Sequence, residues 1–264
     1  MKIENLIATM NYLTPKKLIS DMNIKSSFIL INQITEDVFN GETYKNTFNV
    51  HEKGLSKSRN MALKKSKADI CVISDDDLRY KDNYLDIIKT AYQKYPDASV
   101  IAFHVDNINP EKTIKKMKEG KVDFLHLMKI SSVQITFKRE NVLKNNIKFD
   151  LNFGSGSSKY INGEENIFLA DCYKSGLKVY YVPLTIATIM DNNSSWFKGY
   201  NEIYFKTKGA VFYKLSKKIY FLLILQFIVR KYRLYKKDIT PIKALKLMLK
   251  GAKEVKKNEL EVAK

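Results

Sequence analysis

The sequence predicts an α/β fold in which a mostly parallel sheet is covered by helices and followed by a basic helical extension. Two observations lead to this prediction. Short, continuous apolar runs alternate with amphipathic helical segments over the first half of the chain, which is typical of parallel strands buried on both faces. The C-terminal fifth, residues 211–264, has fifteen Lys or Arg and four Asp or Glu, and so carries +11 of the net charge of +18.

The composition is that of a globular protein. Of the 264 residues, 45% are hydrophobic and 28% are charged, which excludes a wholly disordered chain, a collagen and a multi-span membrane protein. The two cysteines, Cys71 and Cys172, are too few for a disulfide scaffold and lie in apolar segments, so we expect both to be buried and reduced. The N-terminus lacks the pattern of a signal peptide. Together these features predict a cytoplasmic protein.

Four apolar runs give the first strands of the expected sheet: residues 6–10, 28–31, 70–73 and 99–103, with a helix over 84–95 before the last of them. Polar residues follow each run, at the carboxyl end of the strand, where open α/β sheets bind ligands. Further along, the pattern predicts a half-buried strand over 133–137, a helix over 166–175 that ends at Gly176, and a strand over 179–182 that ends at Pro183.

The C-terminal region predicts two basic amphipathic helices. Residues 219–229 are apolar except for Gln226, but these eleven residues are too few to span a bilayer as a helix, which takes roughly 20. Thr240-Pro241 then marks a helix start. We expect the apolar face of the helix that follows to consist of Ile242, Leu245, Leu249 and Ala252. Beside this face runs a stripe of lysines, Lys243, Lys246, Lys250 and Lys253.

Asp75-Asp76-Asp77 is the most informative motif of the sequence. Three adjacent carboxylates at the end of a buried strand repel one another and lose hydration. A divalent cation together with a phosphate would make the arrangement favourable, because hard cations take oxygen ligands. The alternative is a solvated acidic turn that leads into the next helix.

A second motif, Gly54-Leu55-Ser56-Lys57-Ser58-Arg59-Asn60, stands at a helix start just before the strand that ends in the three aspartates. Backbone N–H groups there, with two hydroxyls and two cations nearby, suit an anionic or nucleotide ligand. The alternative is an ordinary helix cap with a solvated basic first turn.

A third motif, Gly163-Glu164-Glu165-Asn166, opens the helix expected over 166–175. One explanation is the helix dipole, which favours acidic residues in the first turn. The other is a general base, a carboxylate that takes a proton from an acceptor hydroxyl while the Gly/Ser-rich loop at 153–158 closes over the substrate. Trp196 either lines an acceptor site or has an ordinary packing role.

The order of these parts resembles a family 2 glycosyltransferase with the GT-A fold, of the kind found among bacterial surface-polysaccharide enzymes. The resemblance covers roughly residues 5–190. It is carried by a strand ending in Thr9-Met10-Asn11, by Asn32-Gln33 after the second strand, by the Gly-Leu-Ser-Lys-Ser-Arg-Asn segment, by the three aspartates and by the later Gly-Glu-Glu. It implies an inverting transfer of a sugar from a nucleotide-sugar, most often UDP-linked in this family, to a saccharide or lipid-linked acceptor.

The resemblance also implies roles for individual residues. Asp76 would hold the ribose side of the nucleotide, Asp77 would bind Mg²⁺ or Mn²⁺ at the diphosphate, and Asp75 would share either task. The other expected nucleotide contacts are Thr9, Asn11, Arg59 and Gln33, the last of which follows the second strand where the family usually has an acidic residue. Glu165 is the expected base, and Glu164 is its orienting neighbour.

These inferences predict a GT-A domain over 1–205, with a nucleotide-sugar half at about 1–110 and an acceptor half at about 111–205, and a basic helical extension over 206–264. The extension implies an anionic partner, which we expect to be the inner face of the cell membrane and not a nucleic acid. Residues 219–229 either meet that membrane or pack back on the catalytic domain. Two alternatives stay open. A nucleotidyltransferase, or another metal-dependent nucleotide enzyme, explains the aspartates but not Gly-Glu-Glu. A non-catalytic nucleic-acid-binding protein explains the charge but leaves the carboxylates without a task.

Overall fold

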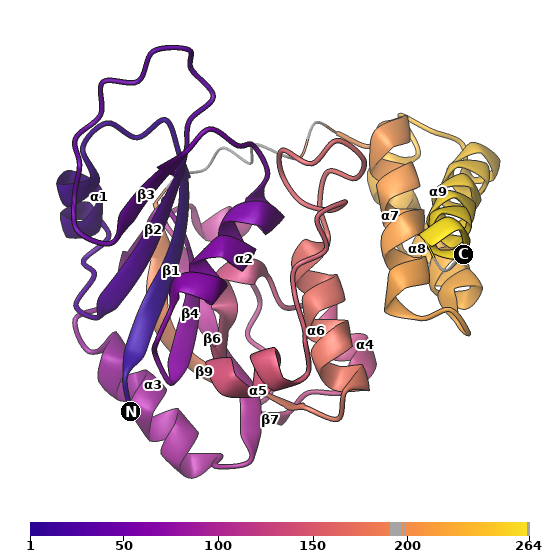
Figure 1. Cartoon of the computed structure of the whole chain (residues 1–264). Helices are drawn as coiled ribbons and strands as arrows, with labels where there is room; N and C mark the ends of the chain where they lie inside the picture. The colour runs from indigo at the N-terminus through magenta and orange to yellow at the C-terminus, as the bar shows by residue number, and fades with distance from the viewer. Residues whose placement is uncertain (191–196, 198, 263–264) are drawn as a thin grey trace. The chain divides into compact units, whose positions relative to one another are not determined.

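The computed structural model describes residues 1–190, 197 and 199–262, so Trp196 lies outside the described residues. The chain divides into two compact units (Figure 1). The first comprises Met1–Phe149 and Phe168–Asn193, and the second comprises Asp150–Ile167 and Ser194–Lys264. The boundary falls within helix α6 (Glu164–Lys174). The domain boundary expected at residue 205 stays a prediction.

The first unit is built on one mixed sheet with the strand order β3-β2-β1-β4-β8-β6-β9-β5, in which β7 also pairs with β9. Its strands are β1 (Ile3–Met10), β2 (Ser27–Gln33), β3 (Thr47–Val50), β4 (Ile70–Asp75), β5 (Leu78–Tyr80), β6 (Ala98–Asn107), β7 (Gly120–Lys121), β8 (Ile135–Lys138) and β9 (Lys178–Ile189). Strands β1, β2, β3, β4, β6 and β9 run in one direction, and β5, β7 and β8 run against them. The predicted mostly parallel α/β sheet is confirmed.

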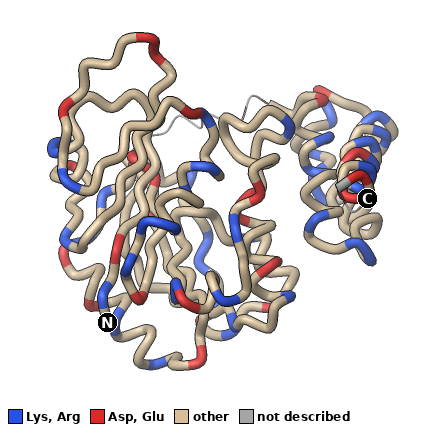
Figure 2. Tube along the Cα trace, in the orientation of Figure 1, with Lys and Arg blue, Asp and Glu red and all other residues tan. Residues whose placement is uncertain are grey.

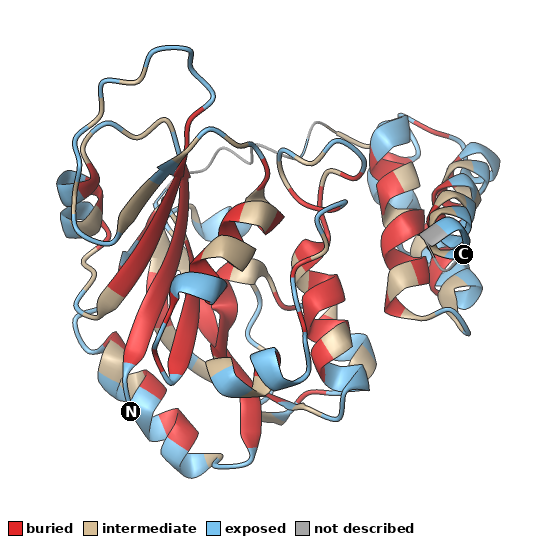
Figure 3. Ribbon diagram, viewed as in Figure 1, coloured by how far each residue is buried: buried red, intermediate tan, exposed pale blue. Residues whose placement is uncertain are grey.

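Helices cover both faces of this sheet because its central strands are apolar on both faces. In β1, Ile3 and Ile7 pack against helices α1 (Pro15–Asp21) and α3 (Tyr84–Lys94). Leu6 lies on the opposite face, whose core includes residues of α2 (Leu55–Lys65), α4 (Phe124–Leu127), α5 (Arg139–Lys144) and α6. Figure 3 shows the strands as the buried layer between these helices. Cys71 and Cys172 are buried in the same core, as predicted, and burial raises the pKa of Cys71 to about 12.

The expectation of a half-buried strand at 133–137 is wrong. Gln134, in the turn just before β8, and Thr136 of β8 are only 1% and 0% exposed, because helices cover both faces of the sheet. Their side chains find partners inside the sheet. The Gln134 amide donates to the Phe103 carbonyl at 2.9 Å, and the Thr136 hydroxyl donates to the Ile101 carbonyl at 2.8 Å. A buried polar group is tolerated when it is hydrogen-bonded in this way.

The expected end of a strand at Pro183 is also wrong, since β9 continues to Ile189. Val182 pairs with Phe103 and Thr185 with His104, so Pro183 falls within a register shift between β9 and β6. A proline has no N–H to donate to a ladder, and an irregularity of this kind is where a strand accommodates one.

The second unit contains three helices that follow one another, α7 (Glu202–Leu215), α8 (Tyr220–Tyr235) and α9 (Pro241–Val262), so the helical extension is confirmed. Helix α9 starts where Thr240-Pro241 predicts, and the Thr240 hydroxyl accepts the Lys243 N–H at 3.3 Å. The lysines along α9 are visible as blue segments in Figure 2. Among the helices of the described ranges, none has both the length and the apolar character that crossing a membrane requires.

The face on which α9 packs differs from the predicted one. Of the predicted apolar residues, Ala252 is buried as expected but Ile242 is 69% exposed, and Ala244 and Met248 are buried in its place. The reason is a close approach of two helix backbones. A Cβ at Gly209 of α7 would lie 1.8 Å from the Met248 carbonyl oxygen of α9. In the same way, a Cβ at Gly251 of α9 would lie 1.9 Å from the Lys206 carbonyl oxygen of α7. Helix α9 therefore turns its face of small residues toward α7.

Candidate active site

The carboxyl ends of three neighbouring strands meet at one edge of the sheet in the first unit. Thr9 of β1 pairs with Asn32 of β2, and Ala8 of β1 pairs with Asp75 of β4. This register brings the ends of β1 and β2 beside the turn that follows β4. Polar residues that are far apart in the sequence thus lie together, at the edge where a sheet of this kind binds its ligands.

Asp76 and Asp77 form the turn between β4 and β5. The Thr9 hydroxyl donates to the Asp76 carboxylate at 2.5 Å, and the Asp77 carbonyl accepts the Met190 N–H at 2.8 Å. Asp76 is exposed and Asp77 is half-buried. The turn is thereby fixed from two strands, β1 and the end of β9, while both carboxylates remain accessible.

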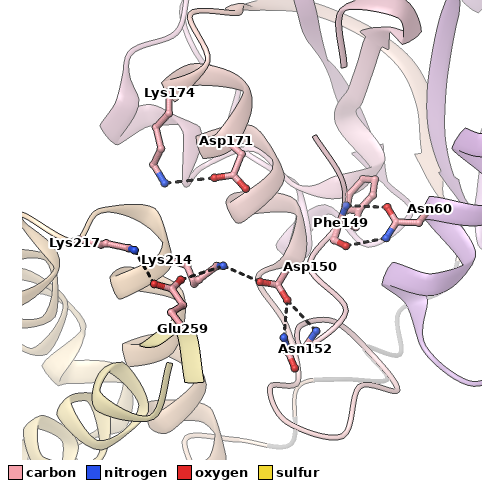
Figure 4. A network of polar contacts seen from close by, with 9 residues as sticks. All are labelled: Asn60, Phe149, Asp150, Asn152, Asp171, Lys174, Lys214, Lys217 and Glu259. Atoms are coloured by element: carbon pink, nitrogen blue, oxygen red, sulfur yellow. Dashed lines mark hydrogen bonds and ion pairs between the residues drawn. The ribbon is translucent and has the colours of Figure 1, made fainter. Parts of the chain in front are cut away.

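Arg59 of α2 is 1% exposed, and its guanidinium donates to the Asp75 carboxylate at 2.9 Å. The alternative of a solvated basic first turn is therefore wrong for this residue. A buried guanidinium is stable only when it is paired, and here it also lies 5.5 Å from the centre of the Phe149 ring. The neighbouring Asn60 holds Phe149 in place, because its side-chain amide bonds the backbone N–H and C=O of Phe149, each at 2.8 Å (Figure 4).

The amide side chains after β1 and β2 hold the surrounding loops. The Gln33 side-chain oxygen accepts the Gly54 N–H at 2.6 Å and so fixes the start of α2. The Asn11 amide donates to the Thr35 hydroxyl at 2.8 Å. The roles of Gln33, Asn11 and Thr9 as nucleotide contacts stay predictions.

Tyr12 is a candidate residue that the sequence analysis missed. Its backbone N–H donates to the Asn32 side chain at 3.0 Å, which anchors it beside the ends of β1 and β2. Burial raises the pKa of the Tyr12 hydroxyl, and the carboxylates of Asp21 and Asp76 raise it further. The only signal in the sequence is an aromatic residue directly after the polar end of the first strand.

Glu164 and Glu165 lie in the second unit, in the first turn of α6. Glu164 is 5% exposed and Glu165 is half-buried. Lys208 of α7 is their charged neighbour. Burial lowers the pKa of Lys208, and the carboxylates of Glu165 and Glu164 oppose that shift. No local pattern indicates Lys208, because it lies more than forty positions from the glutamates.

The Gly/Ser-rich loop before the glutamates is ordered by its own contacts. The Phe153 and Tyr160 rings stack at 4.6 Å. Asp150, at the foot of the loop, lies 3.0 Å from the Lys214 ammonium of α7, which in turn lies 3.4 Å from the Glu259 carboxylate of α9. Figure 4 shows both ion pairs. Burial opposes ionisation of Asp150, but hydrogen bonds from Asn152 and Lys214 outweigh it and lower the pKa of this carboxyl. The loop and these two helices line an open pocket of about 230 Å³.

Comparisons with known proteins bear on the family and the fold. The profile of glycosyl transferase family 2 matches residues 33–164, half of the chain. No curated protein matches the chain. Residues 1–349 of TarS from S. aureus, solved in complex with UDP-GlcNAc, are similar with a TM-score of 0.65 and 13% identity over 96% of this chain and 82% of that chain.

The same part of TarS in complex with UDP has a TM-score of 0.60 and 14% identity, over 90% of this chain and 74% of that chain. At such identities the likeness shows the fold, and the profile match shows the family. The chain belongs to glycosyl transferase family 2, and it is a glycosyltransferase.

Proposed function

We propose that the protein transfers a sugar from a UDP-sugar to a hydroxyl of a saccharide or lipid-linked acceptor, with inversion at the anomeric carbon, in bacterial envelope or capsular polysaccharide synthesis. The observation that carries the proposal is the pair of contacts Thr9–Asp76 and Arg59–Asp75 at the carboxyl edge of a sheet that belongs to this family. The likeness to TarS structures that hold UDP-GlcNAc and UDP supports a UDP-linked donor.

The donor atoms at the sheet edge fit a hard divalent cation such as Mg²⁺ or Mn²⁺. Asp77 and Asp75 are partly exposed and offer carboxylate oxygens, the ligands that such cations prefer. Within the described ranges, no three His, Cys, Asp or Glu side chains converge into a complete ligand set. We therefore assign the cation to one or two carboxylates, Asp77 first and Asp75 second, which would hold it beside the diphosphate. A bound cation would offset the negative charge that develops on the leaving diphosphate.

The chain's own residues account for the rest of the donor side. The Arg59 guanidinium neutralises Asp75, which keeps one of three adjacent carboxylates from repelling the diphosphate. Thr9 orients the Asp76 carboxylate, which is then set to accept hydrogen bonds from a ribose. Arg59, Asn11 and Gln33 are the proposed further contacts to the nucleotide.

On the acceptor side we assign the general base to Glu165. A carboxylate in that role takes the proton of the attacking hydroxyl as the bond to the anomeric carbon forms. Glu164 is its proposed orienting neighbour. The pocket beside the loop suits a saccharide chain, since Asp150, Asn152 and Lys214 offer polar groups and Tyr160 an aromatic one.

The proposed location is the cytoplasm, with the protein bound peripherally to the inner face of the membrane, where a lipid-linked acceptor would be presented. The basic residues of the C-terminal region support this location, because an anionic leaflet attracts each nearby Lys or Arg with about 1 kcal/mol.

Thermal unfolding with a panel of ligands tests the function. UDP with Mn²⁺ is expected to raise the Tm by several degrees at saturation, whereas GDP, CMP and oligonucleotides have smaller effects. A shift by UDP that is the same with and without Mn²⁺ would count against the cation. Stabilisation by oligonucleotides and not by any nucleoside diphosphate would replace the proposal with a nucleic-acid-binding function.

A further inference from the structure

Helix α8 is apolar on two sides, and only one of them is buried in the second unit. The inner side contributes Leu223, Ile224, Ile228 and Tyr235 to the core of the helices. The outer side consists of Phe221, Leu222, Leu225, Val229 and Tyr232, which are 44%, 62%, 37%, 76% and 45% exposed. With 3.6 residues per turn, these five positions fall within an arc of about 100° around the helix. We call them the outer face of α8.

A continuous apolar strip of this kind is unusual on a protein surface. Single exposed apolar side chains are common, but a contiguous patch marks a binding surface for a protein, a membrane or a ligand. The charged residues beside the strip indicate which of these three partners it binds. Residues 217–238 include seven Lys or Arg and a single acidic residue, Asp238. Arg230 and Arg233 are exposed. By helical position Arg233 borders the outer face, about 20° beyond Leu222, whereas Arg230 lies about 80° beyond it.

We propose that the outer face of α8 docks on an anionic lipid surface. The helix would lie in the plane of the interface, with its apolar side chains at the acyl boundary and Arg233 at the level of the lipid phosphates, which the long Arg230 side chain would reach from further round the helix. Its sixteen residues are too few to span a bilayer, which takes about 20. The proposal rests on the peripheral location given above and deepens it, because it names the element that makes the contact.

Charge favours a lipid surface over a second copy of this chain. If α8 packed on α8 of another copy, two sets of cations would border one interface, and like charges juxtaposed there oppose association. An anionic leaflet instead brings charge of the opposite sign to Arg230, Arg233 and the lysines at both ends of the helix.

Vesicle co-sedimentation of the full chain tests the proposal with matched variants. The vesicles contain one part phosphatidylglycerol and two parts phosphatidylcholine. The variant L222Q/V229Q replaces the two most exposed apolar side chains of the outer face without changing the net charge. The control I242Q/L260Q makes the same kind of change on α9, where Ile242 and Leu260 are 69% and 58% exposed. Point substitutions are used because removal of α9 would uncover the buried side of α7.

The wild type is expected to bind at low salt and to be released in part at high salt, because exposed charges are screened. L222Q/V229Q is expected to bind vesicles roughly tenfold more weakly or worse, because it loses the free energy that burial of a Leu and a Val side chain contributes. I242Q/L260Q is expected to bind like the wild type. R230Q/R233Q should bind more weakly and with less dependence on salt. Circular dichroism confirms that each variant is folded.

Three results would overturn the proposal. One is no vesicle binding by the wild type, and another is equal binding by the wild type and L222Q/V229Q. The third is a wild-type oligomer that L222Q/V229Q dissociates, which would assign the outer face to a second copy. UDP release from a UDP-sugar is measured on the same samples and should be equal in all of them. Its absence from the wild type would count against the proposed function and leave the vesicle result standing.

Discussion

At the scale of single residues, Asp75 and Asp77 have different surroundings, and their substitution should have different consequences. Asp75→Asn removes the charged partner of a guanidinium that is 1% exposed. Breaking a buried ion pair costs about 3–5 kcal/mol, and because the Asp75 side chain is itself 31% exposed we expect a smaller loss. We predict that Asp75→Asn lowers the free energy of unfolding by about 1–3 kcal/mol, measured by urea denaturation.

Asp77→Asn is the matched variant, with the same chemical change two positions away in the accessible turn. It should leave the free energy of unfolding within about 0.5 kcal/mol of the wild type, as surface substitutions usually do. If Asp75→Asn proves as stable as Asp77→Asn, the Arg59–Asp75 pair does not hold the sheet edge together.

The roles of Glu165 and Glu164 can be distinguished by the same kind of comparison between two variants. Glu165→Gln keeps the shape of the side chain but cannot accept a proton, so turnover should fall by roughly 10²–10⁴. Binding of UDP, which that residue does not contact in our proposal, should be unchanged by calorimetry. A far larger loss in Glu164→Gln would exchange the two roles. Unchanged turnover in both variants would leave the helix dipole as the reason for the acidic pair.

At the scale of elements, the contact between α7 and α9 depends on glycine. Gly209→Ala would place a Cβ 1.8 Å from the Met248 carbonyl oxygen, so the helices must move apart. In an unconstrained helix, Ala is more stable than Gly by about 1 kcal/mol. We predict the opposite sign here, a loss of about 1–3 kcal/mol from overpacking, measured by thermal unfolding. Lys246→Ala on the exposed side of α9 is the control, and a stabilised Gly209→Ala would contradict the close approach.

The strands of the first unit could be predicted because buried parallel strands are apolar on both faces, as the observed β1, β2, β4 and β6 are. Helix α7 could not be predicted in the same way. Most of its residues from Tyr204 to Leu215 are buried, and its lysines do not gather on one side, so the sequence shows no clear helical periodicity there. The packing face of α9 was missed because small residues, and not the larger Ile242, set how closely two helices approach.

The candidate site was predictable only in part, for a related reason. Polar residues after buried strands indicated the sheet edge, since strand ends are local features of the sequence. The pairing of Arg59 with Asp75, the anchoring of Gly54 by Gln33, and the cation Lys208 beside the glutamates are contacts between distant segments. Only the register of the sheet and the packing of the helices bring them together.

At the scale of the whole molecule, the proposed tasks divide between the two units. The donor-side residues Thr9, Arg59 and Asp75–Asp77 belong to the first unit, and the glutamate pair and the outer face of α8 belong to the second. The strongly positive C-terminal region is consistent with a tethering role, because charge of one sign attracts an anionic surface without specifying the reaction.

Release of UDP from UDP-GlcNAc tests the central claim most directly. The assay compares the wild type with Asp77→Asn, each with Mn²⁺ and with a chelator. We predict that the wild type releases UDP only with Mn²⁺, and that Asp77→Asn, although folded, releases none and no longer binds UDP in a Mn²⁺-dependent way. Release that is unaffected by the substitution and by the chelator would contradict the assignment of Asp77 and the cation. No release from this or any other nucleotide-sugar would contradict the proposed reaction itself.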